Sequence, residues 1–433
     1  MDEVRVTHSA QPPGKEVYEM SAMDVPVQSI SYLPALGGEK NLMKVAQLMP
    51  GEHFGREGTN GLYVRGGNSS QNLILLDGMP LYYLNHLGGF VSIFDNAAIN
   101  DARLYKGGFP ASYGGRVSSV FDIRMNDGNS NQFSANLKAG IVSSKFSLEG
   151  PVKDSNTTFF LSGRRLTMDL FMNAYYAVAD NTGISGYTFW DTNAKITHKF
   201  NNNNRIAFSF YAGDDRQYFK HKNEFDKTTT TYNKDNRWGN LLGAMHWYHT
   251  FSPGLALKTS VGFTRYRYKK EDEFKEEDEN SPERRYKSFF SGIVDYRGKS
   301  FLEYDVSNHY TIKGGVSSFY RKFNPEKMVY KKQEDNTSLL DTSKGSPVLN
   351  SVESSLFLEN RFALGDYFNF NLGFRTSTFF IKDHAFYSFE PRLLMTVRPT
   401  DGWKVQGSLS KMQQNIHFIT YLGLNQPVDL WLP

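Results

Sequence analysis

Charged side chains recur among the short apolar stretches of residues 61–125, and ion pairing is the chemistry that they could perform. The set consists of Arg65, Asp77, Arg103, Arg116, Asp122 and Arg124. Charged groups among apolar strands must be either paired or solvated. The pattern therefore predicts ion pairs between this segment and a polar surface elsewhere in the chain. The alternative is that these residues lie solvated on the segment's own surface, where a pair contributes only about 0–1 kcal/mol.

Sequence motifs for catalysis and for cofactor binding are missing. No HExxH, GxSxG or Walker sequence occurs, and the ten histidines are scattered without metal-ligand spacing. The chain has no cysteine, so it can form neither a disulfide nor a thiolate metal site. Its net charge of +4 is too small to indicate a nucleic-acid partner. We therefore predict that the protein is not an enzyme and that it uses no cofactor and no metal.

Glycines punctuate the same segment. They are Gly66, Gly67, Gly78, Gly107, Gly108, Gly114 and Gly115. Glycine permits positive φ angles and close approach of two backbones, and a domain packed against an enclosing wall needs both. Ordinary turn chemistry is the alternative for most of these positions. The VRGG sequence at 64–67 lacks the spacing of a phosphate-binding loop.

Beyond residue 133 the sequence alternates with a period of two. In FNFNLGFR the residues on one face are Phe368, Phe370, Leu372 and Phe374, and those on the other are Asn369, Asn371, Gly373 and Arg375. Such alternation is typical of strands with one apolar and one wet face. The mean hydropathy of -0.51 is compatible with a membrane β-barrel, because each strand needs apolar residues on its lipid face only. A soluble sandwich or propeller is the competing fold, but no blade motif repeats at fixed spacing.

The connections between these strands also alternate in length. Short polar turns occur at 153–156, 201–204, 252–254, 307–309, 364–366 and 400–402. Longer polar excursions, which we expect to be loops, occur at 166–186, 214–236, 270–287, 323–350 and 412–433. Short turns at one end and long loops at the other are typical of outer-membrane barrels. We count about 12 strands, many longer than the roughly 9–11 residues that cross a bilayer, and expect them to extend above it.

The N-terminal part is organised differently. A short helix is predicted over 39–49, ended by Pro50 and Gly51, and strands are predicted at 61–65, 72–77, 102–106 and 117–124. The polar stretch 126–132 is a natural linker. We therefore divide the chain into a domain at 1–130 and a partial barrel at 131–433. No signal peptide begins the sequence and no closing strand ends it, so we expect both ends to be truncations.

Several motifs resemble the plug domain of TonB-dependent outer-membrane receptors, most closely the Bacteroidetes-type members. They are VRGG (64–67), LLDGMPLY (75–82), INDARLYKGGFPASYGGR (99–116) and SSVFDIRM (118–125). LEGPV (148–152), LSGRR (161–165) and PVDLWLP (427–433) resemble barrel segments of that family. The plug signature of the starch-utilisation type of glycan importer is matched poorly, which makes a glycan substrate less favoured.

The resemblance implies a mainly β fold: a mixed α/β plug followed by an incomplete antiparallel transmembrane barrel, about 12 of an expected 22 strands. An open half barrel would leave unpaired strand edges in lipid, so we expect the chain to belong to a longer polypeptide. The resemblance also implies location in the bacterial outer membrane. The partners that it implies are the inner-membrane TonB complex, outer-membrane lipid and lipopolysaccharide, and a small solute.

Two sets of site residues follow from the resemblance. The candidate TonB box, an extended segment that would add a strand to TonB, is Asp2, Glu3, Val4, Arg5, Val6 and Thr7. The candidate ligand-facing apex of the plug is Tyr82, Tyr83, Asn85 and His86. The alternatives are an ordinary first strand for the former and packing beneath the barrel rim for the latter.

The predicted function is energised import of a scarce solute, such as a siderophore, cofactor, oligosaccharide or peptide. A non-transporting adhesin or surface receptor is the alternative, and dependence of uptake on the proton-motive force separates the two. A passive porin should lack a plug, so the segment 61–125 argues against it.

Overall fold

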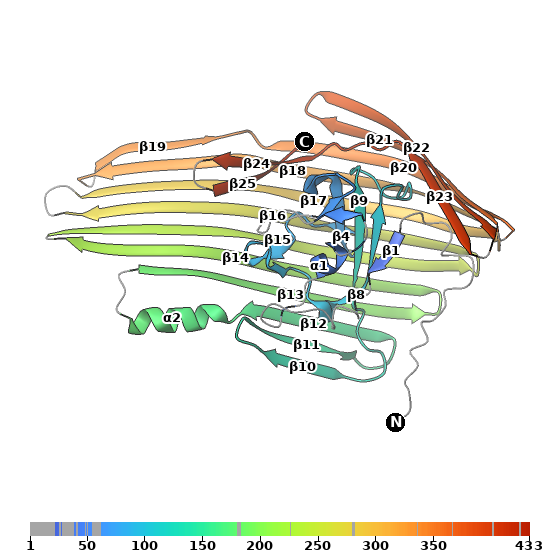
Figure 1. Ribbon diagram of the computed structural model, residues 1–433, viewed down its shortest axis with the longest axis horizontal. Coiled ribbons are helices and arrows are strands. Elements are labelled where there is room, and N and C mark those ends of the chain that lie inside the picture. Colours follow the sequence, from blue (N-terminus) through green and yellow to red (C-terminus); the bar gives the residue numbers. More distant parts are fainter. Residues whose placement is uncertain are drawn as a thin grey trace.

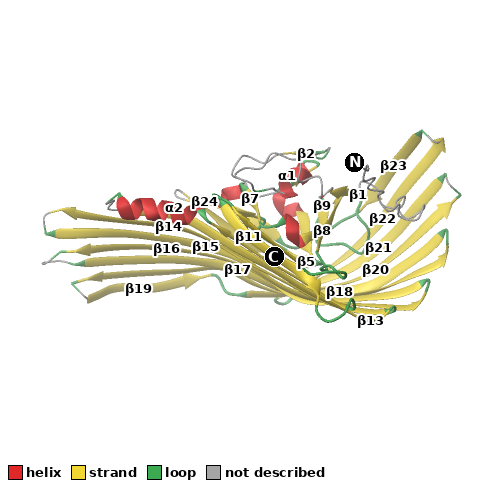
Figure 2. Ribbon diagram, turned by 90° about the horizontal axis from the view of Figure 1, so that it is seen from below, coloured by secondary structure: helices red, strands yellow, loops and turns green. Residues whose placement is uncertain are grey.

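The computed structural model describes residues 22–25, 27, 39, 42–47, 49, 51–53, 62–179, 183–225, 227–278, 282–335, 337–365, 367–400, 402–423 and 426–433. Two sheets dominate this part of the chain. A five-stranded sheet lies against the concave face of a much larger sheet of 14 strands (Figures 1 and 2). We call the described residues 22–125 the plug, and the 14-stranded sheet the barrel wall.

The plug is built on a mixed sheet with the strand order β1-β8-β9-β4-β5, in which only β4 and β9 run parallel. Its strands are β1 (Ala22–Val25), β4 (Asn72–Leu76), β5 (Met79–Pro80), β8 (Ile99–Lys106) and β9 (Ser119–Met125). Two small hairpins join β2 (Glu52–His53) to β3 (Tyr63–Val64) and β6 (Asn85–His86) to β7 (Val91–Ser92). The plug helices are α1 (Leu42–Gln47) and the 3-10 turns η3 (Ser69–Gln71), η4 (Leu87–Gly89) and η5 (Asn96–Ala98).

A two-residue turn fixes the register of β4 and β5. Leu76 pairs with Met79, and the residues between them, Asp77 and Gly78, have φ angles of 44° and 73°. Two successive positive φ angles define the type I′ turn, which matches strand twist and favours Asp-Gly. Within the described residues the predicted helix at 39–49 forms as α1, and the buried Leu42, Met43, Val45 and Ala46 join the core of the plug.

The barrel wall is antiparallel throughout and follows the chain from hairpin to hairpin. Its strands are β10 (Ser134–Ala139), β11 (Ser143–Pro151), β12 (Thr157–Leu166), β13 (Gly183–Asn201), β14 (Asn204–Phe225), β15 (Thr228–Ser252), β16 (Leu255–Glu277), β17 (Glu283–Ser307), β18 (Tyr310–Glu334), β19 (Thr337–Gly345), β20 (Leu349–Leu364), β21 (Phe368–Ile381), β22 (His384–Thr400) and β23 (Trp403–Ser410). The total of 14 strands exceeds the predicted 12, and β10 and β23 form the two open edges. The wall is therefore an incomplete barrel, as predicted.

The long polar excursions are largely not loops, and this part of the prediction is wrong. Most of the residues in 214–236 and 270–287 belong to strands β14 to β17, and β18 and β19 account for most of 323–350. Strands β14 to β18 are 22–25 residues long. Hydrogen bonds to the neighbouring strands satisfy the backbone N–H and C=O groups, whatever the side chains are. A polar sequence therefore does not prevent strand formation. The strands therefore rise well beyond a membrane, as expected from their length.

Two other excursions hold regular structure of their own. The segment 166–186 contains helix α2 (Met168–Val178), which lies beside β13 at one margin of the wall (Figure 1). The segment 412–433 contains the hairpin of β24 (His417–Gly423) and β25 (Gln426–Leu432), which contacts β17 and β18.

The barrel wall is polar on its inner face and apolar on its outer face. On β20 the side chains of Glu353 and Glu359 are 3% and 0% exposed, whereas Leu356 and Leu358 are 58% and 43% exposed. The predicted alternation over 368–375 is confirmed, with the asparagines and Arg375 buried and the aromatic and leucine side chains outside. This distribution, with apolar side chains exposed and polar side chains buried, is the reverse of that in a soluble protein and is typical of a wall in contact with lipid.

No helix in the described part of the chain is both long and apolar enough to span a membrane. β9 ends at Met125 and β10 begins at Ser134. The division of the chain into 1–130 and 131–433 stays a prediction.

Candidate functional site

The surface between the plug and the barrel wall holds most of the buried charge in the described residues. One ionic cluster joins the end of the plug sheet to β13 and β14. Lys195 on β13 lies 3.0 Å from the carboxylate of Asp77 and 2.9 Å from that of Asp127, and it also donates to the Met125 carbonyl at 3.0 Å. Arg205 on β14 binds the other oxygen of Asp127 at 2.6 Å. The Asp77 and Lys195 side chains are 4% and 6% exposed, so the pair is screened little by water.

A second cluster surrounds His86 on β6. Its Nδ1 lies 2.8 Å from Asp215 and its Nε2 lies 3.1 Å from Asp191, so that both ring nitrogens face carboxylate oxygens of the wall. Both nitrogens can donate only in the charged imidazolium form. The ring also stacks on Phe189 with a centroid distance of 4.3 Å and an interplanar angle of 9°. Tyr187 donates to Asp215 and accepts from the Leu87 amide at 2.6 Å.

The electrostatics of His86 follow from this geometry. Burial alone would lower its pKa, but Asp215 and Asp191 together outweigh burial and raise the pKa above the ordinary 6.5. Arg164 on β12 extends the cluster, because it binds Asp191 at 2.6 Å and Glu39 of the plug at 2.9 Å. Burial tends to raise the pKa of Glu39, yet Arg164, Lys145 and the hydroxyl of Ser143 hold it below the ordinary value.

A third group of contacts consists of hydrogen bonds from the wall to backbone groups of the plug loop 107–116. Arg392 on β22 donates through Nη1 to the carbonyls of Phe109, Pro110 and Tyr113 at 3.0, 2.6 and 2.8 Å. The Ser112 amide donates to Glu359 at 2.6 Å, and the Ser112 carbonyl accepts from Lys299 at 2.8 Å. The wall thus holds this loop with charged side chains on neutral carbonyl and amide groups. Hydrogen bonds of this kind contribute roughly 1.5–3 kcal/mol each.

A fourth group of contacts surrounds Tyr82 and Arg116 of the plug. Tyr82 donates to Asp295 on β17, and Arg321 on β18 binds Asp295 at 3.5 Å and also Glu353. Arg116, 4% exposed, donates to the Gly115 carbonyl at 2.8 Å and lies over the Trp431 ring. Burial is the main reason that the pKa of Arg116 falls to about 10.

The charged residues singled out in the sequence therefore take different partners. Asp77 pairs with the barrel wall, as hypothesised for the whole set. Arg103 and Arg124 instead pair within the plug, with Asp24 at 2.6 Å and Asp101 at 3.8 Å. Asp122 likewise accepts from Tyr113 of the plug at 2.8 Å. These pairs hold the plug together and do not dock it on the wall.

The four residues of the predicted apex are brought together and buried. Tyr82, Tyr83, Asn85 and His86 are 8%, 9%, 5% and 1% exposed. Tyr83 stacks on Tyr266 of the wall, and its carbonyl accepts from Asn240 at 2.7 Å. In this conformation they face the wall, not open solvent, and contact with a ligand stays a prediction.

The glycines singled out in the sequence take two roles. Gly66, Gly78, Gly107, Gly108 and Gly115 have positive φ angles. Gly67 and Gly114 do not, but a Cβ on either would collide with a neighbouring side chain, that of Ser118 and that of Arg375 respectively. Arg65, between β3 and η3, itself has a φ of 48°. The candidate TonB box, 2–7, lies outside the described residues.

The partners on the wall were not singled out in the sequence as partners of the plug, although Arg375 was assigned to the polar face of its strand. They are Arg164, Lys195, Asp191, Asp215, Lys299, Glu359, Arg375 and Arg392. The sequence does carry one signal for them, the alternation of polar and apolar residues, because each lies on the polar face of its strand. This alternation predicts that their side chains face the barrel interior, but it does not predict which atom of the plug each one contacts.

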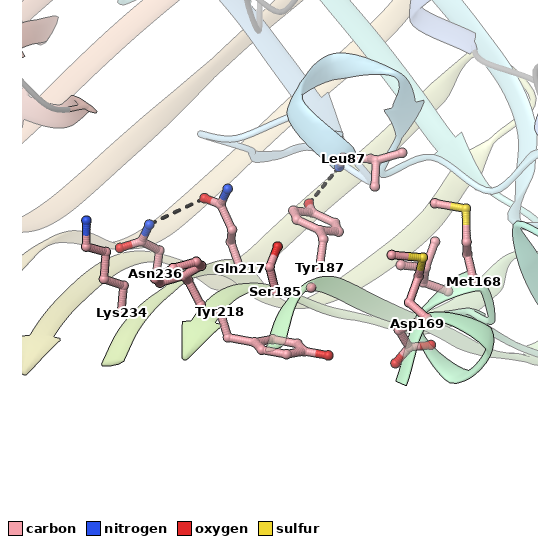
Figure 3. Close-up of a pocket in the computed structure, with 13 residues that line it drawn as sticks. Leu87, Met168, Asp169, Ser185, Tyr187, Gln217, Tyr218, Lys234 and Asn236 are labelled. Carbon is pink, nitrogen blue, oxygen red and sulfur yellow. Dashed lines mark hydrogen bonds between the residues drawn. The ribbon is translucent and has the colours of Figure 1, made fainter. Parts of the chain in front are cut away.

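A cavity of about 380 Å³ lies between α2, β13 and β14, beside the η4 turn of the plug (Figure 3). Its lining is mostly apolar and includes Leu87, Met168, Met172, Tyr187 and Tyr218, with Asp169 at one side. Asp169 is 6% exposed, and its Oδ1 has no hydrogen-bond partner while Oδ2 binds Arg165 at 2.8 Å. The cavity thus offers an apolar chamber with one free acceptor. The described residues contain no cluster of three or more His, Asp or Glu side chains arranged to hold a metal.

Comparison with known proteins agrees with this arrangement. Residues 25–119 match the family model for the TonB-dependent receptor plug domain. Among curated proteins, none matches the sequence closely enough to count as a relative. The fold resembles the outer-membrane ferripyoverdine receptor of Pseudomonas aeruginosa, at 12% identity and a TM-score of 0.61 over 94% of this chain and 58% of that one.

Two further structures share the fold. The RagAB peptide importer in its closed-closed state matches at 9% identity and a TM-score of 0.64, covering 96% of this chain and 64% of that one. The siderophore receptor PiuA from Acinetobacter baumannii matches at 13% identity and a TM-score of 0.56, covering 92% and 64%. The chain therefore spans less than two thirds of each of these structures.

The small sheet seated in a lipid-facing wall is the plug-and-barrel architecture of an outer-membrane receptor. The match over 25–119 identifies this sheet as a plug domain of the TonB-dependent receptor type, and the fold of the chain is the one seen in outer-membrane receptors.

Proposed function

We propose that this chain is the plug and the first part of the barrel of an active transporter, which imports a scarce solute across the outer membrane with energy supplied through TonB. The observation that carries the proposal is the polar character of the contact between plug and barrel. Lys195, Arg164 and Arg392 dock the plug through ion pairs and backbone hydrogen bonds. Water can replace such contacts when the plug moves, so a polar seam suits a gate that must open and reclose.

The solute itself is proposed only by class. The RagAB and PiuA structures are named for peptide and siderophore ligands, which keeps both classes open for this chain. The cavity beside α2 provides aromatic and thioether surface together with the free acceptor of Asp169. A solute that combines an apolar group with a hydrogen-bond donor would fit that lining.

The candidate TonB box gives the sharpest test. The segment 2–7 would add a strand to the edge of the TonB C-terminal domain, mainly through main-chain hydrogen bonds. Binding of the purified full-length protein to that domain is measured by calorimetry for the wild type, the deletion of residues 2–7, Val4→Pro and the matched control Val4→Ile. We expect Val4→Pro and the deletion to abolish binding, because proline removes a ladder donor, and Val4→Ile to retain it.

The alternative, a non-transporting adhesin or surface receptor, makes a different prediction in the same experiment. An adhesin has no use for energy from the inner membrane, so its plug would be a fixed closure without affinity for TonB. Absence of binding by the wild-type protein would favour this alternative. Equal binding by the wild type and by Val4→Pro would refute the placement of the box at 2–7.

A further inference from the structure

A second cavity, of about 500 Å³, separates the plug sheet from strands β13 to β18 of the wall. Its lining is charged and polar, unlike that of the cavity beside α2. On the plug side it is bounded by Gly78, Ser112 and Asp122, and on the wall side by a group of basic residues. The cavity extends toward the short turns, because Lys258 and Lys313 each lie three residues into their strands after the turns 252–254 and 307–309. In outer-membrane barrels short turns face the periplasm.

Four cations line this cavity without a carboxylate of their own. They are Lys258 on β16, Arg297 and Lys299 on β17, and Lys313 on β18. None of the four has a carboxylate oxygen within 4.0 Å in the part of the chain that the structure describes. Other basic residues of the cavity are neutralised, since Lys195 and Arg205 bind Asp127, and Arg124 binds Asp101. The lining holds seven basic and four acidic side chains, so a net excess of three positive charges remains, and we call the four residues without a carboxylate partner the cationic track.

The members of the track are adjacent in the sheet. Lys258 stands opposite Phe301 in the pairing of β16 with β17, Ser260 opposite Lys299, and Gly262 opposite Arg297. Neighbouring strands are separated by about 4.8 Å, so successive members are within reach of one small ligand. The track thus leads from Arg297, whose guanidinium donates to the carbonyl of Gly78 in the plug, toward the short-turn rim.

The track makes its contacts with neutral groups. The Lys299 ammonium binds the Ser112 carbonyl at 2.8 Å and lies 5.0 Å from the centre of the Tyr113 ring. Arg297 is 7% exposed, and its Nε has no hydrogen-bond partner. Glu359 accepts a hydrogen bond from the Ser112 amide with one carboxylate oxygen and from Arg361 with the other. Carbonyl and ring contacts orient these side chains without forming ion pairs.

We propose that this cavity is an anion-binding vestibule, in which a solute bearing carboxylate or phosphate groups rests on its way to the periplasm. Displacement of the plug would release Arg297 from Gly78 and Lys299 from Ser112, which would present both cations to the solute at the moment of opening. The inference rests on the proposed function for the direction of transport, but the anion site itself does not depend on it.

The lack of cysteine allows a direct measurement of the local charge. Phe301 lines the cavity between two members of the track, with Lys313 4.6 Å and Lys299 5.5 Å from its ring centre. A Phe301→Cys variant of the full-length protein in detergent gains a thiol within a 433-residue sequence that otherwise has none. It is treated with methanethiosulfonates that differ in charge, a sulfonate and a trimethylammonium. Thr400→Cys, at an exposed short turn, is the matched control.

We expect the ratio of anionic to cationic reaction rates to be about tenfold higher at Phe301→Cys than at Thr400→Cys, since a desolvated cationic cleft concentrates anions. The ratio compares two reagents on one thiol, so a change in thiol ionisation cancels. Adding Lys299→Gln and Lys313→Gln should bring the ratio to the control value. If those variants fold poorly, raising the salt to 1 M should do the same in the parent, because the Debye length falls to about 3 Å. Equal ratios at both cysteines would overturn the proposal.

Binding is tested on the same thiol. Inorganic phosphate should slow modification of Phe301→Cys by the sulfonate reagent more than potassium chloride does at the same ionic strength, because both salts screen the charge but only phosphate occupies the site. Equal effects of the two salts would overturn the binding site. Loss of TonB binding, in contrast, would refute the transporter and leave these rates unchanged, so the two failures are distinguishable.

Discussion

Asp77 of the plug and Lys195 of the barrel wall form a 3.0 Å ion pair in which both side chains are more than nine-tenths buried. Asp77 also occupies the first position of the β4–β5 turn, with its Oδ1 accepting from the Met125 amide at 3.0 Å. One carboxylate therefore fixes the turn, joins two strands of the plug and docks the plug on β13. The same side chain therefore both stabilises the plug and connects it to the wall.

Removal of one member of this pair should loosen the plug. We expect Lys195→Met to destabilise the docked plug by about 3–5 kcal/mol, because it leaves the Asp77 carboxylate buried without its cation. Protease sensitivity of the plug in urea measures the effect. Addition of Asp77→Asn, which keeps the side-chain shape and tolerates positive φ, should recover part of the loss. A double variant no more stable than Lys195→Met would contradict the pairing.

Arg392 should control the loop 107–116. Arg392→Gln removes three charge-assisted hydrogen bonds to loop carbonyls, and we expect backbone amide exchange of this loop to rise by at least about tenfold, the equivalent of 1.4 kcal/mol. Mass spectrometry of deuterium uptake measures it. Arg398→Gln, on the same strand and without these contacts to the loop, is the matched control. Similar exchange in the two variants would show that Arg392 does not hold the loop.

The docking of the plug should depend on pH through His86. Its pKa is raised in the folded protein, so pairing with Asp191 and Asp215 is fully stabilising below about pH 6.5 and is lost as the pH rises through the raised pKa. We expect the plug to be more sensitive to protease at pH 9 than at pH 6. His86→Gln should reduce this difference, whereas His309→Gln, an exposed turn residue, should preserve it. An unchanged pH profile in His86→Gln would rule out the imidazolium as its source.

The outer face of β20 should be in contact with lipid. Leu356→Arg places a charge near the middle of that strand, and we expect it to destabilise the barrel in phospholipid vesicles by about 2–4 kcal/mol. Leu339→Arg, on the long-hairpin end at β19, should change stability little. Urea midpoints of the vesicle-inserted protein measure both. The same small cost for the two variants would place β20 outside the bilayer.

The sequence was sufficient for the fold where the signal was local. The alternation over 368–375 predicts which side chains face lipid, and the pair Asp77-Gly78 is typical of a tight turn. Both features depend only on residues that are adjacent in the sequence. Polar stretches such as 214–236 were mistaken for loops, since a strand paired on both edges needs no apolar face. His86 lies 105 and 129 positions from its partners Asp191 and Asp215, and no local pattern specifies which inward residue it meets.

The central claim is that the plug is a movable gate in the barrel lumen, and a disulfide between the two can test it. A Cβ on Gly373 of β21 would lie 3.0 Å from the Cβ of Ala111 in the plug loop, about 0.5 Å closer than the shortest usual disulfide distance, so the loop must move outward by that amount for the bond to form. In Ala111→Cys/Gly373→Cys the loop should be locked to the wall when oxidised and free when reduced. The single variants Ala111→Cys and Gly373→Cys are the controls.

The most direct measurement is the conductance of single full-length molecules in a planar lipid bilayer, with urea raised in steps to release the plug. The wild type, the single variants and the reduced double variant should open reversibly while the barrel stays inserted. The oxidised double variant should remain closed until a reductant is added. Opening of the oxidised protein at the same urea concentration as the wild type would contradict a gate formed by the plug.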